Sequence, residues 1–275
     1  MRPRKSFLVP AILLAATTLA VSCAGGMAAM YVWPTGTTVS YEMTTNMTMS
    51  VEIPGGGEQA VSQNSLMAYS IRATGPRQFE ISITDAEENS DVDMSAGMVP
   101  TTSELIGWVG TVTLDERGIV TDATNLEGNS FIEFQGERAF KEQTLQSLFQ
   151  ILPEGPLGPG VEWSREYSFP MNMMGIELDF SVTDAYSCLE AAPYEGTAAF
   201  KIGSKSTVSL AGGGEMEGAV VDFGLAGDSE GTTHIASGTG MVLHSENMVR
   251  MSGGMSAQGM DVPITMQLAI TLRVK

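Results

Sequence analysis

The chain has 275 residues, of which 43% are hydrophobic and only 7% aromatic, and its formal net charge is −18 at pH 7. This negative charge argues against nucleic acid and anionic lipid head groups as partners, because both would be repelled. The 31 glycines and the shortage of aromatic residues suit many short strands joined by tight turns.

The N-terminus has the pattern of an exported protein. Arg2, Arg4 and Lys5 precede an apolar run, FLVPAILLAATTLAV, that ends at Val21. A basic segment followed by a short apolar run is typical of a secretory signal and too short for a lasting membrane span. Residues 1–22 are therefore predicted to be a signal peptide. Their removal would lower the net charge from −18 to about −21.

The end of this segment, LAVSC, resembles the lipobox of bacterial lipoproteins. The resemblance implies cleavage before Cys23 and acylation of that cysteine with palmitate-type chains, although Ala20 stands where leucine is commoner. Several buried acyl chains hold a protein firmly in a membrane. Ala24, in place of the aspartate that favours inner-membrane retention, implies the outer membrane of a bacterial cell envelope. Residues 23–30 would be a short lipid-anchored tether. The alternative is an ordinary signal peptide followed by an incidental cysteine.

Alternating hydrophobicity begins in the stretch SYEMTTNMTMSVEI, residues 40–53. Its apolar residues occupy odd positions, and the same period of two recurs at 67–71, 79–83, 108–114, 221–225 and, most regularly, at 264–274. One-sided strands separated by turn sequences such as PGGG and DERG predict antiparallel sheet.

Two segments interrupt this alternation. In GERAFKEQTLQSLFQILPEGP the apolar residues recur every three or four positions, which predicts one amphipathic helix over residues 137–151, stopped by Pro153. In SFPMNMMGIELDF the apolar parity changes beside Gly175, which predicts a β-bulge or kink there.

A weak internal repeat surrounds the predicted helix. Four short matches follow one another at offsets of about 126 to 131 residues: SYEM with EYSF, AYSI with AFKI, FEI with VSL, and GTVTLDERGIV with GMVLHSENMV. We therefore predict one β domain over residues 31–275. Copy 1 would span about 31–125, the helix and its connections 126–154, and copy 2 about 155–275. The alternative is that alternating strands resemble one another by composition alone.

The lipobox, the two related β halves and the segment ILPEGPLGPGVEW together resemble a group of uncharacterised bacterial lipoproteins. Their closing signature is similar to Leu152, Pro153, Gly160 and Trp163 here. More distantly the layout is similar to the lipoprotein-carrier fold. That resemblance implies a mainly β protein, an antiparallel two-copy half-barrel or sandwich with one amphipathic helix packed on it.

The sequence motifs do not predict an enzyme. GDSEG at 227–231 has the G-x-S-x-G spacing, but strand-like residues follow where a nucleophile elbow needs a helix, so we predict a glycine-rich turn. His234 and His244 lack metal-ligand spacing, and the acidic run 85–93 is predicted to be a solvated loop. Cys188 reads as a small apolar residue in a strand. No cofactor and no metal are predicted.

Methionine is unusually frequent, with 19 residues. Flexible, polarizable thioethers suit an adaptable apolar surface, so we predict a non-enzymatic protein that binds an apolar or lipid-like ligand on a concave sheet face. The predicted ligand-facing residues are Met43, Met47, Met49, Met171, Met173 and Met266. One alternative is a structural or scaffolding lipoprotein with a packed core and no ligand. Another is Cu(I) binding, which would need a third sulfur from an adjacent strand.

Overall fold

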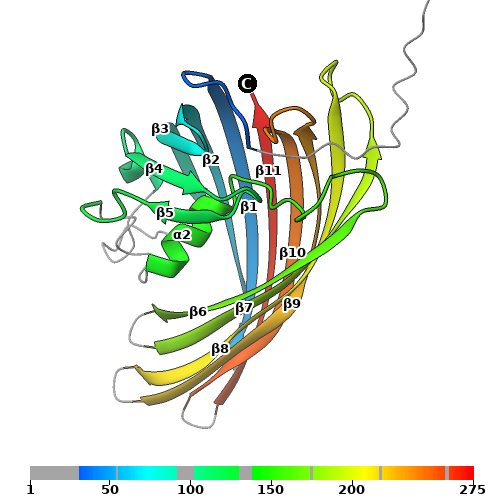
Figure 1. Ribbon diagram of the computed structural model, residues 1–275. Helices are drawn as coiled ribbons and strands as arrows, with labels where there is room; N and C mark the ends of the chain where they lie inside the picture. The colour runs from blue at the N-terminus through cyan, green and yellow to red at the C-terminus, as the bar shows by residue number, and fades with distance from the viewer. Residues whose placement is uncertain are drawn as a thin grey trace, which may run out of the picture.

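The computed structural model describes residues 31–53, 55–91, 102–129, 138–173, 176–216, 219–257 and 260–275. Of residues 139, 140, 171–173, 176, 216 and 219 only the backbone is described. The described residues form a single, strongly coiled antiparallel sheet with a short helix on its inner side (Figure 1).

The sheet has eleven strands in the described part of the chain. Their bounds are β1 (Thr38–Ile53), β2 (Gly57–Gly75), β3 (Gln78–Ser90), β4 (Val109–Leu114), β5 (Val120–Ala123), β6 (Glu162–Met173), β7 (Ile176–Ala191), β8 (Ala199–Met216), β9 (Ala219–Ala236), β10 (Val242–Ala257) and β11 (Met260–Val274). The helices are the 3-10 turn η1 (Thr102–Leu105) and the α-helix α2 (Arg138–Gln146).

The strand order is β5-β4-β3-β2-β1-β11-β10-β9-β8-β7-β6. Two meanders, β1–β5 and β6–β11, are therefore joined edge to edge through the antiparallel pair β1 and β11. The edges of the sheet are β5 and β6, the two strands that flank α2 in the chain. The prediction of a mainly β half-barrel is confirmed, and the sandwich alternative is not, because the described strands form one sheet rather than two.

The alternation predicted from the sequence holds along the central strands. Tyr41, Met43 and Met49 of β1 pair with Val274, Leu272 and Met266 of β11. Directly paired residues lie on the same face of a sheet, and here that face is the inner, concave one, to which the buried Tyr41 and Leu272 belong. Glu42, which pairs with Arg273, lies on the outer face.

Glycines on the concave face allow the sheet to coil. A Cβ at Gly227 in β9 would stand 1.9 Å from the carbonyl oxygen of Arg250 in β10. A Cβ at Gly253 in β10 would stand 1.9 Å from the carbonyl oxygen of Gly224 in β9. Backbone this close to a neighbouring strand has no room for any side chain. The inner face can therefore bend sharply at these two positions.

The segment from α2 to Leu152, called the plug below, fills the upper part of the concave face (Figure 1). The Gln146 side chain accepts a hydrogen bond from the Val120 amide at 2.8 Å and donates one to the Gly118 carbonyl at 2.9 Å. On the other side, the Trp163 indole of β6 donates to the Ile151 carbonyl at 3.0 Å. The plug thus connects the two edges of the sheet.

The predicted helix over 137–151 is too long. It ends at Gln146, and residue 137 lies outside the described residues. The chain then tightens, with the Leu148 amide bonding to Leu145 and the Phe149 amide to Gln146. An extended segment carries Phe149, Ile151 and Leu152 into the core. Their spacing matches the apolar face of a helix, but they reach the core from a turn and the extended segment that follows it.

Two predicted loops are also wrong. Residues 85–90 of the acidic run continue β3, with Leu66 of β2 paired to Glu87, while residues 92 and 93 lie outside the described part. The GDSEG segment lies within β9 rather than in a turn. In a sheet with one solvent-exposed face, acidic residues, serines and glycines are tolerated inside long strands. These residue types therefore do not mark turns in the two segments.

Two sequence predictions fall outside the described residues. These are the signal peptide and the tether with Cys23. The bulge predicted within SFPMNMMGIELDF is wrong, because β6 ends at Met173 and β7 begins at Ile176, and the two strands pair with each other, Phe169 opposite Phe180. The change of parity separates two strands rather than bending one. The internal repeat stays a prediction. Of its matched segments, AYSI and FEI lie in β2 and β3, whereas AFKI and VSL both lie in β8.

Candidate ligand-binding face

The concave face can be followed in rows, since cross-strand partners share a face. In the upper rows the sheet and the plug bury a common core. Phe79 packs edge-on against Trp33 at a ring-centroid distance of 5.1 Å and lies 5.4 Å from Phe149 of the plug. The upper part of the half-barrel is therefore filled by protein.

Below the plug the concave face is again apolar but less covered. This lower floor comprises a buried set, Leu178, Val182, Val208, Val221, Leu225, Met251 and Ile264, and a half-buried set, Met49, Val51, Tyr167, Phe180, Leu210, Phe223, Val249, Met255 and Met266. The two clusters share Phe180, Leu210, Phe223 and Met255, so the floor is continuous. In Figure 1 no described helix lies across it. Its half-buried members leave part of the floor in contact with solvent, and contiguous exposed apolar surface is a feature of binding faces.

A band of polar residues separates the upper core from the lower floor. The polar band consists of Arg165, Asp184, Tyr186, Ser204, Ser206, Ser229, Thr233, Ser245 and Asn247. The Ser229 hydroxyl donates to Asn247 Oδ1 at 2.7 Å, and the Thr233 and Ser245 hydroxyls are 2.9 Å apart. The Tyr186 hydroxyl donates to Asp184 Oδ2 at 2.9 Å. Burial, and then the nearby Asp184 carboxylate, raise the pKa of Tyr186, which keeps this donor protonated.

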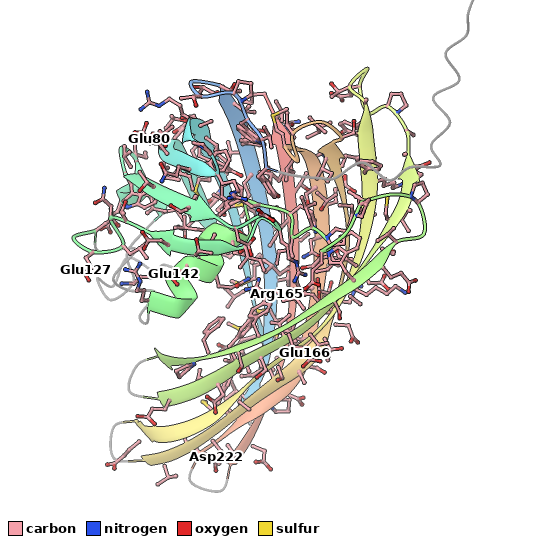
Figure 2. The ribbon with its side chains drawn as sticks, in the orientation of Figure 1. Glu80, Glu127, Glu142, Arg165, Glu166 and Asp222 are labelled. Atoms are coloured by element: carbon pink, nitrogen blue, oxygen red, sulfur yellow. The ribbon has the colours of Figure 1, made fainter. Side chains whose placement is uncertain are left out.

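The polar band was missed by the sequence reasoning. Arg165 and Asp184 occupy the same parity as Tyr167, Phe169 and Val182, which belong to the concave face. A charged residue at an apolar position of an alternating strand was the available signal. Arg165 and its neighbour Glu166, both labelled on β6 in Figure 2, belong to opposite faces of that strand.

The predicted methionines are divided among these zones. Met43 packs against the upper core, Met49 and Met266 belong to the lower floor, and Met47 is half-buried between them on the concave face. Met171 and Met173 hold register positions opposite Leu178 and Ile176, and their side chains are outside the described ones. Only part of the predicted set therefore lines the face that is left uncovered.

The residues considered for catalysis do not come together. Ser229 lies on the concave face, whereas His234 and His244 are cross-strand partners on the outer face. There the His244 ring stacks on Tyr194 at a centroid distance of 5.7 Å, and the His234 ring packs against Tyr194 at 4.3 Å with its plane tilted. Among the described residues, no group of three or more His, Cys, Asp or Glu is arranged to hold a metal ion.

Cys188 is almost fully buried in the core, as its place in an alternating strand predicts. Burial raises the pKa of its thiol, so little of it is thiolate at neutral pH.

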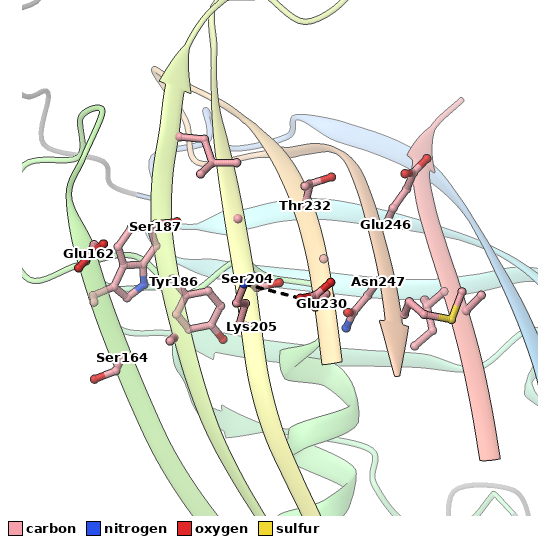
Figure 3. Close-up of a pocket in the computed structure, with 18 of the residues that line it drawn as sticks. Glu162, Ser164, Tyr186, Ser187, Ser204, Lys205, Glu230, Thr232, Glu246 and Asn247 are labelled. Carbon is pink, nitrogen blue, oxygen red and sulfur yellow. Dashed lines mark ion pairs between the residues drawn. The ribbon is translucent and has the colours of Figure 1, made fainter. Parts of the chain in front are cut away.

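The outer face carries a separate hollow of about 1170 Å³ across β6 to β11 (Figure 3). Small residues such as Ser164, Ala185 and Gly203 form its base, and Lys205 and Glu230 form an ion pair across it at 3.7 Å. The hollow is wide, lined by charges of both signs, and lies on the face that is exposed along these strands. Its apolar lining, which includes Leu189 and Met248, is interrupted by the charged side chains of Lys205, Glu230 and Glu246.

No family model and no curated protein matches this chain. Among solved structures, the chain is similar to one titled "Lipid-protein interactions in lipovitellin", with a TM-score of 0.44 and 11% identity. That match covers 89% of this chain and 25% of the other, so the chain spans about a quarter of that protein's length.

Two further solved structures also match: OccK9 (OpdG) of Pseudomonas aeruginosa, and a mutant of the porin of Rh. blastica. Both matches have a TM-score of 0.27 and cover 86% of this chain. The first has 8% sequence identity and covers 98% of the other chain, and the second has 10% identity and covers 100% of the other chain. The resemblance to bacterial lipoproteins and to the lipoprotein-carrier fold stays a prediction, and we infer function from the geometry of the concave face.

Proposed function

We propose that this protein is a membrane-anchored, non-enzymatic lipoprotein that binds a lipid-like ligand on the lower floor of its half-barrel. The observation that carries the proposal is the contrast between the two halves of one concave face. The upper half is filled by the plug, whereas the lower half keeps a continuous set of half-buried apolar side chains. Covering such a surface stabilises a complex by about 25 cal/mol per Å² of apolar area removed from water.

A single charge on the lower floor tests this proposal. Met266→Glu places a carboxylate among Met49, Met251 and Ile264. Met248→Glu is the matched control, because Met248 is also half-buried but lies on the outer face beside Ala269. Native mass spectrometry of detergent-free protein incubated with lipid vesicles should show bound lipid in the unchanged protein and in Met248→Glu. Met266→Glu should hold less lipid by about tenfold or more, since burying an unpaired charge is costly. A folded, unchanged protein without bound lipid would contradict the proposal.

The membrane anchor rests on the lipobox-like LAVSC segment. Cells supplied with an alkyne-labelled fatty acid should incorporate the label into the unchanged protein and not into Cys23→Ala. Label retained by Cys23→Ala would show that the cysteine is not the acylated residue. Among the described residues, no helix is long and apolar enough to cross a bilayer.

A second candidate function is Cu(I) binding, favoured by one specific observation. Met49 pairs with Met266, and Met266 pairs with Met251, so three thioethers from three adjacent strands share one row of the concave face. Adjacent strands lie about 4.8 Å apart, and thioether sulfur selects Cu(I).

Met266→Leu separates the two candidates, because it removes a sulfur but keeps the floor apolar. Weaker Cu(I) binding in a chelator competition, with lipid binding unchanged, would support the copper site. Unchanged Cu(I) affinity would exclude it. Met248→Leu is the control.

A further inference from the structure

The space directly beneath the plug is a cavity of about 200 Å³. Its roof is formed by Gln143, Gln146 and Gln150 of the plug, and its base by the polar band, including Arg165 and Asp184. Tyr167, at its lower edge, also belongs to the lower floor. The cavity is smaller than the roughly 300–1,000 Å³ of a typical small-molecule site. It can hold a polar head group but not a whole phospholipid.

Arg165 enters this cavity with unused hydrogen-bonding capacity. Its Nη1 atom is buried and has no hydrogen-bond partner among the described residues. The guanidinium carbon lies 4.4 Å from the centroid of the Tyr167 ring, which fixes the cation at the boundary between the polar band and the lower floor. A buried guanidinium nitrogen without an acceptor is unfavourable. An acceptor oxygen from a ligand would relieve this cost.

Asp184 is the direct cross-strand partner of Arg165, and its side chain is also buried. One of its oxygens accepts the Tyr186 hydroxyl. The two opposite charges nevertheless form no ion pair among the described residues. The cavity therefore presents a cation and an anion side by side, each with capacity for a further partner.

We propose that the cavity receives the head group of a zwitterionic phospholipid, with its phosphate at Arg165 and its ammonium group at Asp184. This rests on the proposed function, because the acyl chains would extend past Tyr167 onto the lower floor. A purely anionic head group would satisfy Arg165 but would meet the buried Asp184 carboxylate and a chain of net charge −18. A zwitterion complements both charges at once.

The sheet contains a matched control pair. Arg250 and Asp228 are also direct cross-strand partners, but both are exposed on the outer face. Arg165→Gln and Asp184→Asn can therefore be compared with Arg250→Gln and Asp228→Asn. Each comparison has the same change of charge in the same sheet.

The experiment uses the mature chain, residues 23–275, with Cys23→Ser so that its own acyl chains cannot occupy the site. It is incubated with vesicles containing equal amounts of phosphatidylethanolamine and phosphatidylglycerol, and the bound lipids are identified by native mass spectrometry. The unchanged protein should prefer phosphatidylethanolamine by about tenfold or more. If the unchanged protein prefers phosphatidylglycerol, the proposal is wrong, and no variant is needed to show it.

Arg165→Gln should reduce binding of phosphatidylethanolamine by about tenfold or more, and Arg165→Lys, which keeps the charge, should reduce it less. Asp184→Asn should shift the preference towards phosphatidylglycerol, because it removes the carboxylate that repels an anion. The outer-face variants should behave as the unchanged protein does.

The possible failures are distinct. If neither Arg165→Gln nor Asp184→Asn changes lipid binding, and circular dichroism shows that both variants are folded, the head-group assignment is wrong. The proposed function would then still stand. A loss in Arg165→Gln with no change of preference in Asp184→Asn also overturns the zwitterionic assignment. Absence of any bound lipid in the folded, unchanged protein overturns the proposed function itself.

Discussion

Substituting Gly227 by alanine tests the origin of the half-barrel's curvature. The added Cβ would stand 1.9 Å from the Arg250 carbonyl oxygen and 2.7 Å from the Met251 Cα. Both are backbone atoms of β10, so no side chain can rotate away. Reaching ordinary van der Waals contact requires the two strands to separate by roughly 1.5 Å. A separation of this size breaks the ladder hydrogen bonds at that point, because the donor and acceptor atoms of a protein N–H···O bond lie about 2.7–3.2 Å apart.

The expected loss of stability follows from that separation. One or two broken backbone bonds, each worth about 0.5–1.5 kcal/mol net, add to an overpacking cost of about 1–3 kcal/mol. We therefore expect Gly227→Ala to lower the free energy of unfolding by about 2–4 kcal/mol. Gly253→Ala, with the same 1.9 Å approach, should behave alike.

Gly224→Ala is the matched control for this experiment. Gly224 lies in the same strand, and a Cβ there would meet nothing within 4 Å. Its effect should stay within about 1 kcal/mol. Urea unfolding, with the free energy extrapolated linearly to water, measures both changes. If Gly227→Ala and Gly224→Ala agree within about 0.5 kcal/mol, close strand approach is not what requires glycine at position 227.

Three further predictions concern the core and the seam of the sheet. Phe79→Ala empties the space between Trp33 and Phe149, and it should lower the free energy of unfolding by about 3–5 kcal/mol in the same urea assay. As the control, Val109→Ala at an exposed position should change the free energy of unfolding by less than about 1 kcal/mol. Cys188, buried with a raised thiol pKa, should react with Ellman's reagent only slowly in native Cys23→Ala protein and rapidly in urea; equal rates would contradict its burial. Lys275 and Arg273 hold the pKa of Glu42 below its usual range, so its stabilising effect should be complete above the ordinary glutamate pKa of about 4.3 and fade as the pH falls through the lower, folded value. The stability difference between the unchanged protein and Glu42→Gln, followed by urea unfolding across this pH range, should shrink towards acid; a difference that grows would refute the sign.

The strands and their inner faces could be read from the chain because alternation is a local property. In β1 and β11 every second residue from Tyr41 to Val51 and from Ile264 to Leu272 falls on the concave face, as their parity predicts. Local patterns were less reliable where polar residues continue a strand, as in residues 85–90 of β3 and in the GDSEG segment of β9.

The helix illustrates a different limit of local reasoning. The spacing of the apolar residues alone could not show that Phe149 and Ile151 reach the core after a turn. The turn is held by hydrogen bonds to residues that are distant in the sequence. The Gln146 side chain bonds to backbone near β5, and Trp163 of β6 holds the Ile151 carbonyl.

The amino-acid sequence by itself therefore determined the strand content, the side of each central strand that is apolar, and the acidic character that disfavours anionic partners. Only the tertiary structure decided which apolar residues of the concave face the plug covers and which lie below it. Met43 and Met49 are six residues apart on the same face of one strand, yet Met43 packs against the core beneath the plug and Met49 lies on the lower floor. The pairing of Arg165 with Asp184 also depends on register between strands. Long-range register and the position of the plug arise from packing the whole sheet, and a local pattern of hydrophobicity does not contain them.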